Sequence, residues 1–274
     1  MGAVTVAGDL PRRLLTAAVG LPLVWAVATV GGAFFAATLA LVCAVATWEL
    51  CRLAGAHRAV TMLACALGVG LLAIAVNAGA GPTLVALGAC ATPATALALA
   101  MRRRAPDATH PDVATRQLLV VLATLVWVAL PLAVLALLHA GGGAGWVALA
   151  LSVTWGADAG ACLVGRRFGR TPLTSVSPRK TREGALAGLL TALLGAALVR
   201  ALWLPDLDPL LCLVIAAAAN AAGQLGDLGA SLLKRAAGAK DSGRIVPGYG
   251  GVLDKVDSLL LAAPLLYGFH CFLT

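Results

Sequence analysis

Ionisable side chains concentrate in two stretches of the chain, residues 155–184 and 223–258. Together these stretches hold six of the 12 acidic residues and 11 of the 20 basic residues. In the second stretch Asp254 and Asp257 are three residues apart, a spacing that places two carboxylates on one face of a helix. Two adjacent anions repel each other unless a cation or basic side chains neutralise them, and Mg²⁺ prefers hard oxygen ligands. Asp227 would supply a third carboxylate, although a capping acid partnered by Lys255 explains the spacing equally well.

A glycine-rich segment, Pro247-Gly248-Tyr249-Gly250-Gly251, lies just before these two aspartates. Glycine lets backbone amides approach phosphate oxygens closely, and the helix expected after it favours an anion at its start. Several bases near this segment can neutralise phosphates, or can equally serve as topology determinants beside lipid headgroups: Lys234, Arg235, Lys240 and Arg244. Carboxylates for a metal ion, a glycine turn and bases are the parts of a phosphoryl or nucleotidyl transfer site.

The elements that must position these groups are membrane helices. Of the 274 residues 61% are hydrophobic and 12% are charged, whereas about a quarter of a soluble domain is charged. Disorder is excluded because the chain is far too apolar. The formal net charge of +8 would suggest nucleic acid as a partner in a soluble protein. Membrane topology explains it here, so no nucleic-acid partner is expected. The seven cysteines contain no C-x-x-C pair and predict no disulfide framework or zinc site.

Nine membrane crossings result when the long uncharged runs are divided at their Gly, Pro and Asn breaks. They fall at about 14–30, 33–48, two between Arg58 and Arg102, two between Gln117 and Asp158, then about 185–204, 209–226 and 257–273. We therefore expect an all-α, polytopic membrane protein. Residues 1–140 would form amino-terminal membrane helices, and residues 141–274 would form the catalytic helices with their cytoplasmic loops.

The basic residues predict an orientation for this path. Nineteen of the 20 Lys and Arg residues fall on one side of it, and cytoplasmic loops are enriched in these residues. The exception, Arg200, can snorkel to the far interface. We expect a multi-pass protein of the inner (plasma) membrane, with the amino terminus cytoplasmic and the carboxyl terminus outside. No cleaved signal is expected, because the first apolar helix leads straight into a second.

The second stretch closely resembles the signature of phosphatidate cytidylyltransferases, also called CDP-diacylglycerol synthases. That signature runs from Ser, two variable residues and Lys-Arg to Lys-Asp, then Pro-Gly-His-Gly-Gly, then Asp-Arg-x-Asp. The matching residues are Ser231, Lys234, Arg235, Lys240, Asp241, Pro247, Gly248, Gly250, Gly251, Asp254 and Asp257. The chain departs from it at Tyr249 in place of His, Lys255 in place of Arg, and Ala230 in place of a common Glu.

The first stretch resembles the other shared segment of the same family. It carries Asp158 and then Ser177-Pro178-Arg179-Lys180-Thr181-Arg182-Glu183-Gly184, with Cys162 replacing a common Tyr. From the residues alone a charged connecting loop explains most of this segment. Asp158 differs, because an acid on an apolar helix usually faces a polar cavity. The resemblance covers roughly residues 150–260.

The resemblance implies a function: CTP and phosphatidate react to give CDP-diacylglycerol and diphosphate. It assigns Asp227, Asp254 and Asp257 to Mg²⁺, with a second cation as an option, and a catalytic role to these residues and Lys234. It places the substrates against Ser231, Arg235, Lys240, Asp241, Pro247, Gly248, Gly250, Gly251, Asp158, Ser177, Lys180 and Thr181. Membrane lipid is the expected surrounding, and a homodimer is one option for assembly.

Two other functions fit some of the same residues. A CTP-dependent kinase of a polyprenol-type lipid alcohol would use similar parts, with a greater need for a general base. A cation-coupled transporter would use Asp158 and Asp227 to bind its ion. Against the transporter stand the absence of an internal repeat in the sequence and the clustering of acids with phosphate-type loops on one side.

Overall fold

The computed structural model describes residues 10–78, 113–174, 177 and 180–274. Within these residues the protein is helical and has no strand beyond two isolated bridges, Pro172 with Thr181 and Val246 with Gly250. This confirms the predicted all-α class. The expected fourth crossing and the basic residues Arg102, Arg103 and Arg104 lie outside the described residues.

Three helices form the amino-terminal part: α1 (Leu10–Val30), α2 (Gly32–Leu53) and α3 (Arg58–Ala78). The predicted break between the first two is confirmed. Gly31 and Gly32 have φ angles of 65° and 53°, in the left-handed region that glycine adopts without steric cost. A side chain at Gly31 would also collide with the His139 ring.

A long apolar stretch follows, built from α5 (Val113–Thr124), α6 (Leu130–Leu151) and α7 (Ala157–Phe168). Single π-helical turns at Leu125–Ala129 and Ser152–Gly156 join these helices. The stretch is interrupted at Gly143, whose φ of 70° breaks α6 between Gln117 and Asp158, where two crossings were predicted. Most of α6 is buried, so this helix forms the centre of the core.

The carboxyl-terminal part contains α8 (Arg182–Trp203), α9 (Pro209–Ala236), the short α10 (Leu253–Val256) and α11 (Leu259–Leu273). Our predicted end of the eighth crossing near residue 226 is wrong by about ten residues. The helix continues through Gly229 and ends just before Gly238, which has a φ of 72°, so α9 includes the first half of the signature. The ninth helix also starts later than predicted, because α10 is a separate turn before it.

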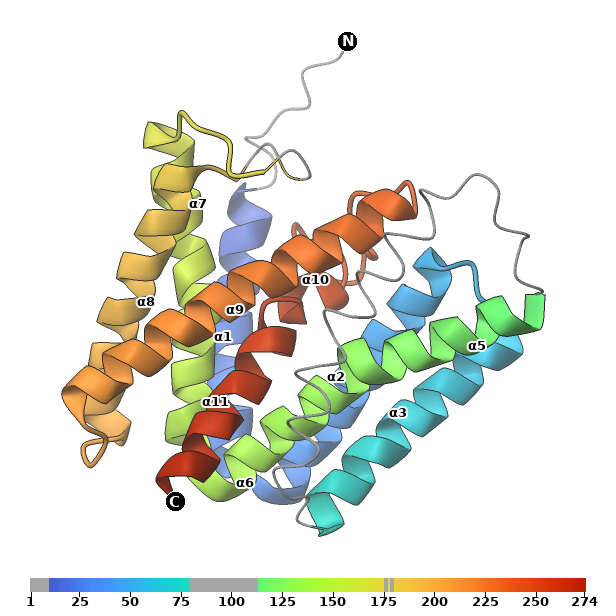
Figure 1. Cartoon of the computed structure of the whole chain (residues 1–274), viewed down its shortest axis with the longest axis horizontal. Coiled ribbons are helices and arrows are strands. Elements are labelled where there is room, and N and C mark those ends of the chain that lie inside the picture. The colour runs from blue at the N-terminus through green and yellow to red at the C-terminus, as the bar shows by residue number, and fades with distance from the viewer. Residues whose placement is uncertain (1–9, 79–112, 175–176, 178–179) are drawn as a thin grey trace.

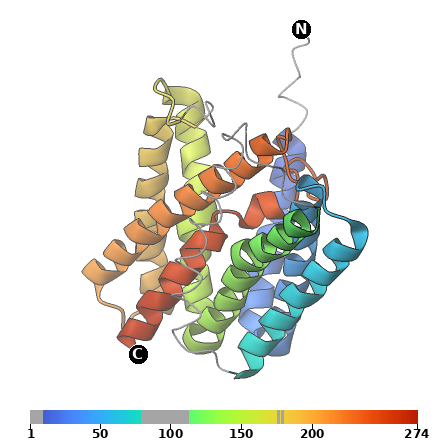
Figure 2. The same cartoon turned by 45° about the vertical axis from the view of Figure 1, so that its right-hand side comes forward.

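Helix α11 packs against both α6 and α9, and α8 packs against α7 and α9 (Figure 1). Small residues let α7 and α8 approach closely: a side chain at Gly160 would collide with Thr191, and one at Gly188 would meet the Ala157 carbonyl. The loops after α7 and after α9 lie toward one end of the molecule, and the carboxyl terminus lies toward the other in both views (Figures 1 and 2).

Five helical stretches of the described residues are long and apolar enough to cross a membrane: Gly32–Leu53, Arg58–Asn77, Thr115–Phe168, Arg182–Trp203 and Pro209–Ala236. Ala18–Val30 and Leu259–Leu273 are shorter apolar helices. Because the Gly143 break divides Thr115–Phe168, that stretch corresponds to two of the expected crossings. The polytopic character is confirmed, whereas the number nine and the orientation stay predictions.

Candidate active site

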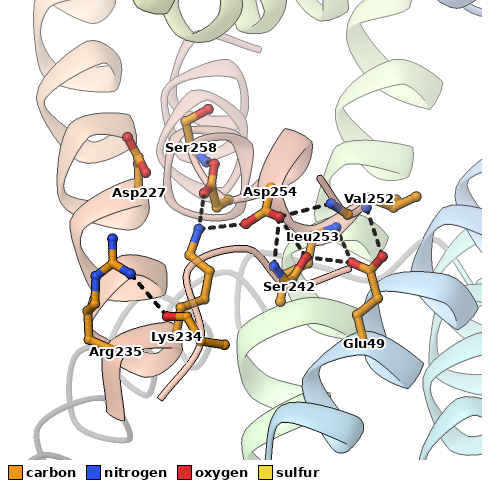
Figure 3. A network of polar contacts seen from close by, with 12 residues as sticks. Glu49, Asp227, Lys234, Arg235, Ser242, Val252, Leu253, Asp254 and Ser258 are labelled. Atoms are coloured by element: carbon orange, nitrogen blue, oxygen red, sulfur yellow. Dashed lines mark hydrogen bonds and ion pairs between the residues drawn. The ribbon is translucent and has the colours of Figure 1, made fainter. Parts of the chain in front are cut away.

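A buried lysine joins the two aspartates that end the signature. The Lys234 Nζ atom on α9 lies 2.6 Å from Asp254 Oδ1 and 3.6 Å from Asp257 Oδ2 (Figure 3). The three side chains are between 7% and 10% exposed. Asp254 lies on α10 and Asp257 caps its end, so the two carboxylates lie on the same side, as their spacing predicted, and share one ammonium group.

A second ion pair connects the two signature stretches. Lys180, which precedes α8, contacts Asp227 on α9 through Nζ and Oδ2, and both side chains are partly buried. Asp158 on α7 is close enough for its charge to interact with those of Asp227 and Lys180. The ionisable residues of the two stretches therefore meet at the junction of α7, α8, α9 and α10.

The electrostatic balance of this cluster is negative. Four carboxylates, those of Asp158, Asp227, Asp254 and Asp257, accompany the ammonium groups of Lys180 and Lys234 and that of Lys255, whose charge acts on Asp158. Burial alone would raise the pKa of Asp254, but Lys234 and two backbone amides hold that pKa below its ordinary value. Burial and the charge of Asp227 instead raise the pKa of Asp257. The carboxyl groups therefore outnumber the ammonium groups, and a further cation beside them would favour the charged form of Asp257.

The side-chain oxygens of the cluster are of the kind that Mg²⁺ binds. Carboxylate oxygens are the ligands that Mg²⁺ prefers, and the excess negative charge suits a divalent ion. In the described part of the chain, however, no three acidic, histidine or cysteine side chains are arranged as a metal-binding group. The ammonium groups of Lys180 and Lys234 occupy the positions beside the carboxylates. The donor chemistry fits the ion, and the assignment of Asp227, Asp254 and Asp257 as its ligands stays a prediction.

The glycine-rich segment forms a tight turn before α10. The Val246 amide donates to the Gly250 carbonyl, and Gly248 and Gly250 have φ angles of 77° and 108°. The amide of Gly251 donates to Asp254 Oδ2. The next two amides donate to a carboxylate from a distant helix, Glu49 on α2: Val252 N lies 3.1 Å from Oε1 and Leu253 N lies 2.8 Å from Oε2. The amides of the turn thus bind carboxylates of the protein itself, and the predicted binding of phosphate by this segment stays a prediction.

Glu49 is the residue of this cluster that sequence reasoning missed. It is fully buried on α2 and also accepts a hydrogen bond from the Ser242 hydroxyl, with a distance of 2.7 Å (Figure 3). A signal for it exists in the sequence. Glu49 is a single acid at the end of an apolar run that begins after Arg13. An ionisable residue in such a place usually faces the bundle interior, which is the argument that singled out Asp158.

The same contact explains two glycines. A Cβ atom at Gly251 would collide with Ser242 Oγ and both Glu49 oxygens, and one at Gly243 would collide with the Glu49 carboxylate. No positive φ is involved at either position, so the requirement is for space. These glycines are needed because the carboxylate of Glu49 lies against the backbone.

Gly251→Ala is expected to destabilise the protein by about 1–3 kcal/mol, because neither partner is the free end of a flexible exposed chain. Thermal unfolding in detergent, followed by circular dichroism, measures the effect. Gly70→Ala in α3 is the matched control, since no atom lies within 4 Å of the added Cβ and alanine favours a helix. An unfolding midpoint for Gly251→Ala equal to that of Gly70→Ala would refute the explanation.

Two departures from the family signature contact each other. The Lys255 Nζ atom lies 3.6 Å from the centre of the Tyr249 ring, in a cation–π contact. The Lys255 carbonyl also accepts a hydrogen bond from Trp155 Nε1 at 2.8 Å, which ties α10 to the other signature stretch. The replacements of His and Arg are therefore neighbours in space.

The remaining predicted residues surround the cluster in different ways. Ser231 lies on α9 between Asp227 and Lys234, and Arg235 donates to the Ala239 carbonyl. The side chains of Lys240 and Asp241 are exposed. The Pro247 carbonyl accepts a hydrogen bond from the Thr16 hydroxyl on α1. The Thr181 hydroxyl caps α8, and the Ser177 carbonyl accepts from the Lys180 amide. Thr181 thus has a structural contact that its sequence assignment did not include.

Similarity to known proteins extends over most of the chain for a family model and over less than half of it for single relatives. A model described as the cytidylyltransferase family matches residues 11–273. A protein of Synechocystis sp. named phosphatidate cytidylyltransferase is 44% identical over 125 residues, which is 44% of this chain and 41% of the relative. A protein of the same name from Haemophilus influenzae is 40% identical over 125 residues, which is 44% of this chain and 43% of the relative. Another from Bacillus subtilis is 40% identical over 123 residues, which is 44% of this chain and 46% of the relative. The aligned stretch thus spans less than half the length of these curated relatives.

Proposed function

The chain belongs to the cytidylyltransferase family, and from this premise we propose that it transfers CMP from CTP to phosphatidate, giving CDP-diacylglycerol and diphosphate. The observation that carries the proposal is the meeting of both signature stretches in one cluster of ion pairs, Lys180 with Asp227 and Lys234 with Asp254 and Asp257. The acceptor, phosphatidate, and the transferred cytidylyl group are those in the names of the relatives.

The chemistry of this reaction asks mainly for charge neutralisation and alignment. An anionic phosphate oxygen of phosphatidate attacks the α-phosphorus of CTP and forms a new P–O bond. The bond from that phosphorus to the oxygen bridging to the β-phosphate breaks, and diphosphate leaves. Because the attacking oxygen already carries charge, no proton has to be removed from it. We propose that Lys180 and Lys234 hold phosphate groups, and the low exposure of Lys234 would strengthen its electrostatic effect.

We further propose that Asp227, Asp254 and Asp257 hold Mg²⁺, with a second cation as an option. A bound divalent ion would neutralise charge on the phosphates. The support is the excess of carboxylates over ammonium groups in the cluster. Each ammonium group would then be free to contact a phosphate oxygen, while the amides of Ser242 and Gly251 keep Asp254 Oδ2 in place.

The proposed site would face the cytoplasmic leaflet of the inner membrane, where a soluble nucleotide meets a lipid headgroup. Its support is the distribution of Lys and Arg along the chain, together with the position of the loops after α7 and α9 at one end of the molecule (Figure 1). The amino terminus would then be cytoplasmic and the carboxyl terminus outside. Protease protection of a carboxyl-terminal tag in inverted vesicles tests this arrangement.

Purified protein with CTP, phosphatidate and Mg²⁺ is expected to form a lipid that retains label from the α-phosphorus of CTP. The alternative, a lipid-alcohol kinase, would transfer label only from the γ-phosphorus and would require a polyprenol-type acceptor. The α-labelled and γ-labelled nucleotides, each offered with either lipid, separate the two reactions. Absence of labelled product from phosphatidate, with cation flux in the absence of CTP, would instead favour the transporter.

A further inference from the structure

Glu49 binds the segment that carries Asp254, although 193 to 204 residues separate it from its partners along the chain. Its carboxylate accepts hydrogen bonds from the Ser242 hydroxyl and from the amides of Val252 and Leu253. The residue is fully buried, so water does not compete for these donors. A buried carboxylate with three donors is a rigid attachment point.

Each of these donors belongs to the immediate support of Asp254. Val252 and Leu253 directly precede it in the chain. Ser242 donates its amide to Asp254 Oδ2 at 2.8 Å, and its hydroxyl oxygen lies 3.0 Å from the same atom. The hydroxyl has one hydrogen and therefore donates to one of the two carboxylates at a time. Glu49 and Asp254 thus lie on opposite sides of Ser242 (Figure 3).

The fit around Glu49 leaves little freedom for the segment. Gly243 and Gly251 both lie so close to the carboxylate that a side chain at either would collide with it. On the outer side of the turn, Thr16 on α1 donates to the Pro247 carbonyl at 3.0 Å. Two amino-terminal helices therefore hold the turn, in addition to the helices that carry the signature.

We propose that Glu49 is a positioning residue, which fixes Asp254 opposite Lys234 by holding Ser242 and the first amides of α10. The proposal rests on the proposed function of this site. Its physical basis is that, among the described residues, Asp254 is held by Lys234 and by the amides of Ser242 and Gly251, and Glu49 binds the segment to which these two amides belong. A shift of about 1 Å in a catalytic group can cost on the order of 100-fold in rate.

Glu49→Gln tests the proposal because it keeps the size of the side chain and removes its charge. The carboxamide has one acceptor oxygen, and its NH₂ group would face an amide or hydroxyl donor, so the turn must move. We expect kcat for cytidylyl transfer to fall by about 10- to 100-fold while the KM for CTP changes less than about threefold. Thr47→Val, a buried change of similar size two residues away on α2, is expected to keep wild-type kcat.

Amide hydrogen exchange measures positioning without reference to activity. In Glu49→Gln the amides of Ser242 and Gly251, which donate to Asp254 and not to Glu49, are expected to exchange faster than in wild type and in Thr47→Val. This readout stands even if the wild-type protein fails to transfer CMP. That failure would remove the proposed function while leaving the positioning role intact.

Ser242→Ala completes the experiment, since it removes the hydroxyl between the two carboxylates and keeps the backbone. The losses in kcat for Glu49→Gln and Ser242→Ala are expected to be non-additive in the double variant. If Glu49→Gln does not fold, Glu49→Asp takes its place in the cycle. Wild-type kcat in the Glu49 variant, unchanged exchange at Ser242 and Gly251, or strictly additive losses would each overturn the proposal.

Discussion

Asp254→Asn is expected to lower cytidylyl transfer on the order of 1,000-fold while the protein stays folded. Asp254 uses its two oxygens differently: Oδ1 contacts Lys234, and Oδ2 accepts from the amides of Ser242 and Gly251. An asparagine can keep the two amide contacts through its oxygen. Its NH₂ group then faces the Lys234 ammonium, and the negative charge proposed to bind Mg²⁺ is gone.

The measurement is the initial rate of labelled lipid formation at saturating CTP, with the unfolding midpoint recorded on the same preparation. Asp206→Asn is the matched control, because it makes the same chemical change at an exposed position in the connection between α8 and α9. It is expected to keep wild-type turnover. Full turnover in Asp254→Asn would remove Asp254 from both the metal site and the catalytic cluster.

The local parts of this site could be predicted from the sequence because they depend on short spacings. Asp254 and Asp257 face one partner, as residues three apart on a helical turn do, and the breaks at Gly31 and Gly143 lie where the apolar runs divide. The extent of α9 was predicted less well. Glycines inside a membrane helix resemble helix ends in a sequence. Gly223, Gly226 and Gly229 lie within α9, where backbone carbonyls or side chains of neighbouring segments approach them closely.

The partners of the charged groups could not be predicted, because they depend on packing between distant helices. Spacing marks Lys180 and Asp227 as ionisable residues of two different stretches, and only the packing of α8 on α9 joins them. Glu49 is the extreme case, since the signature recognised in the sequence covers roughly residues 150–260 and leaves out the helix that carries it. The predicted division at residue 140 placed the site in the second part alone, whereas Glu49 and Thr16 contact it from the first.

Lys234→Met is expected to cause the largest loss of stability among these variants, about 3–5 kcal/mol, because it leaves two buried carboxylates without their shared cation. Methionine has similar length and no charge, so packing is largely retained. Transfer of CMP is expected to fall below detection as well. Chemical unfolding in mixed micelles measures the first effect and the labelled-lipid assay the second. Arg182→Met, at an exposed position in the first turn of α8, is expected to change stability by less than about 0.5 kcal/mol.

A second substitution separates the cost of a buried charge from the loss of catalysis. In Lys234→Met with Asp257→Asn, one uncompensated carboxylate is removed, so stability is expected to recover by more than half of the loss. Activity is not expected to recover, because the double variant lacks both the ammonium group proposed to hold phosphate and a proposed metal ligand. Recovery of turnover together with stability would show that Lys234 serves only to balance the charge of the aspartates, and that the phosphate-binding role belongs to other bases.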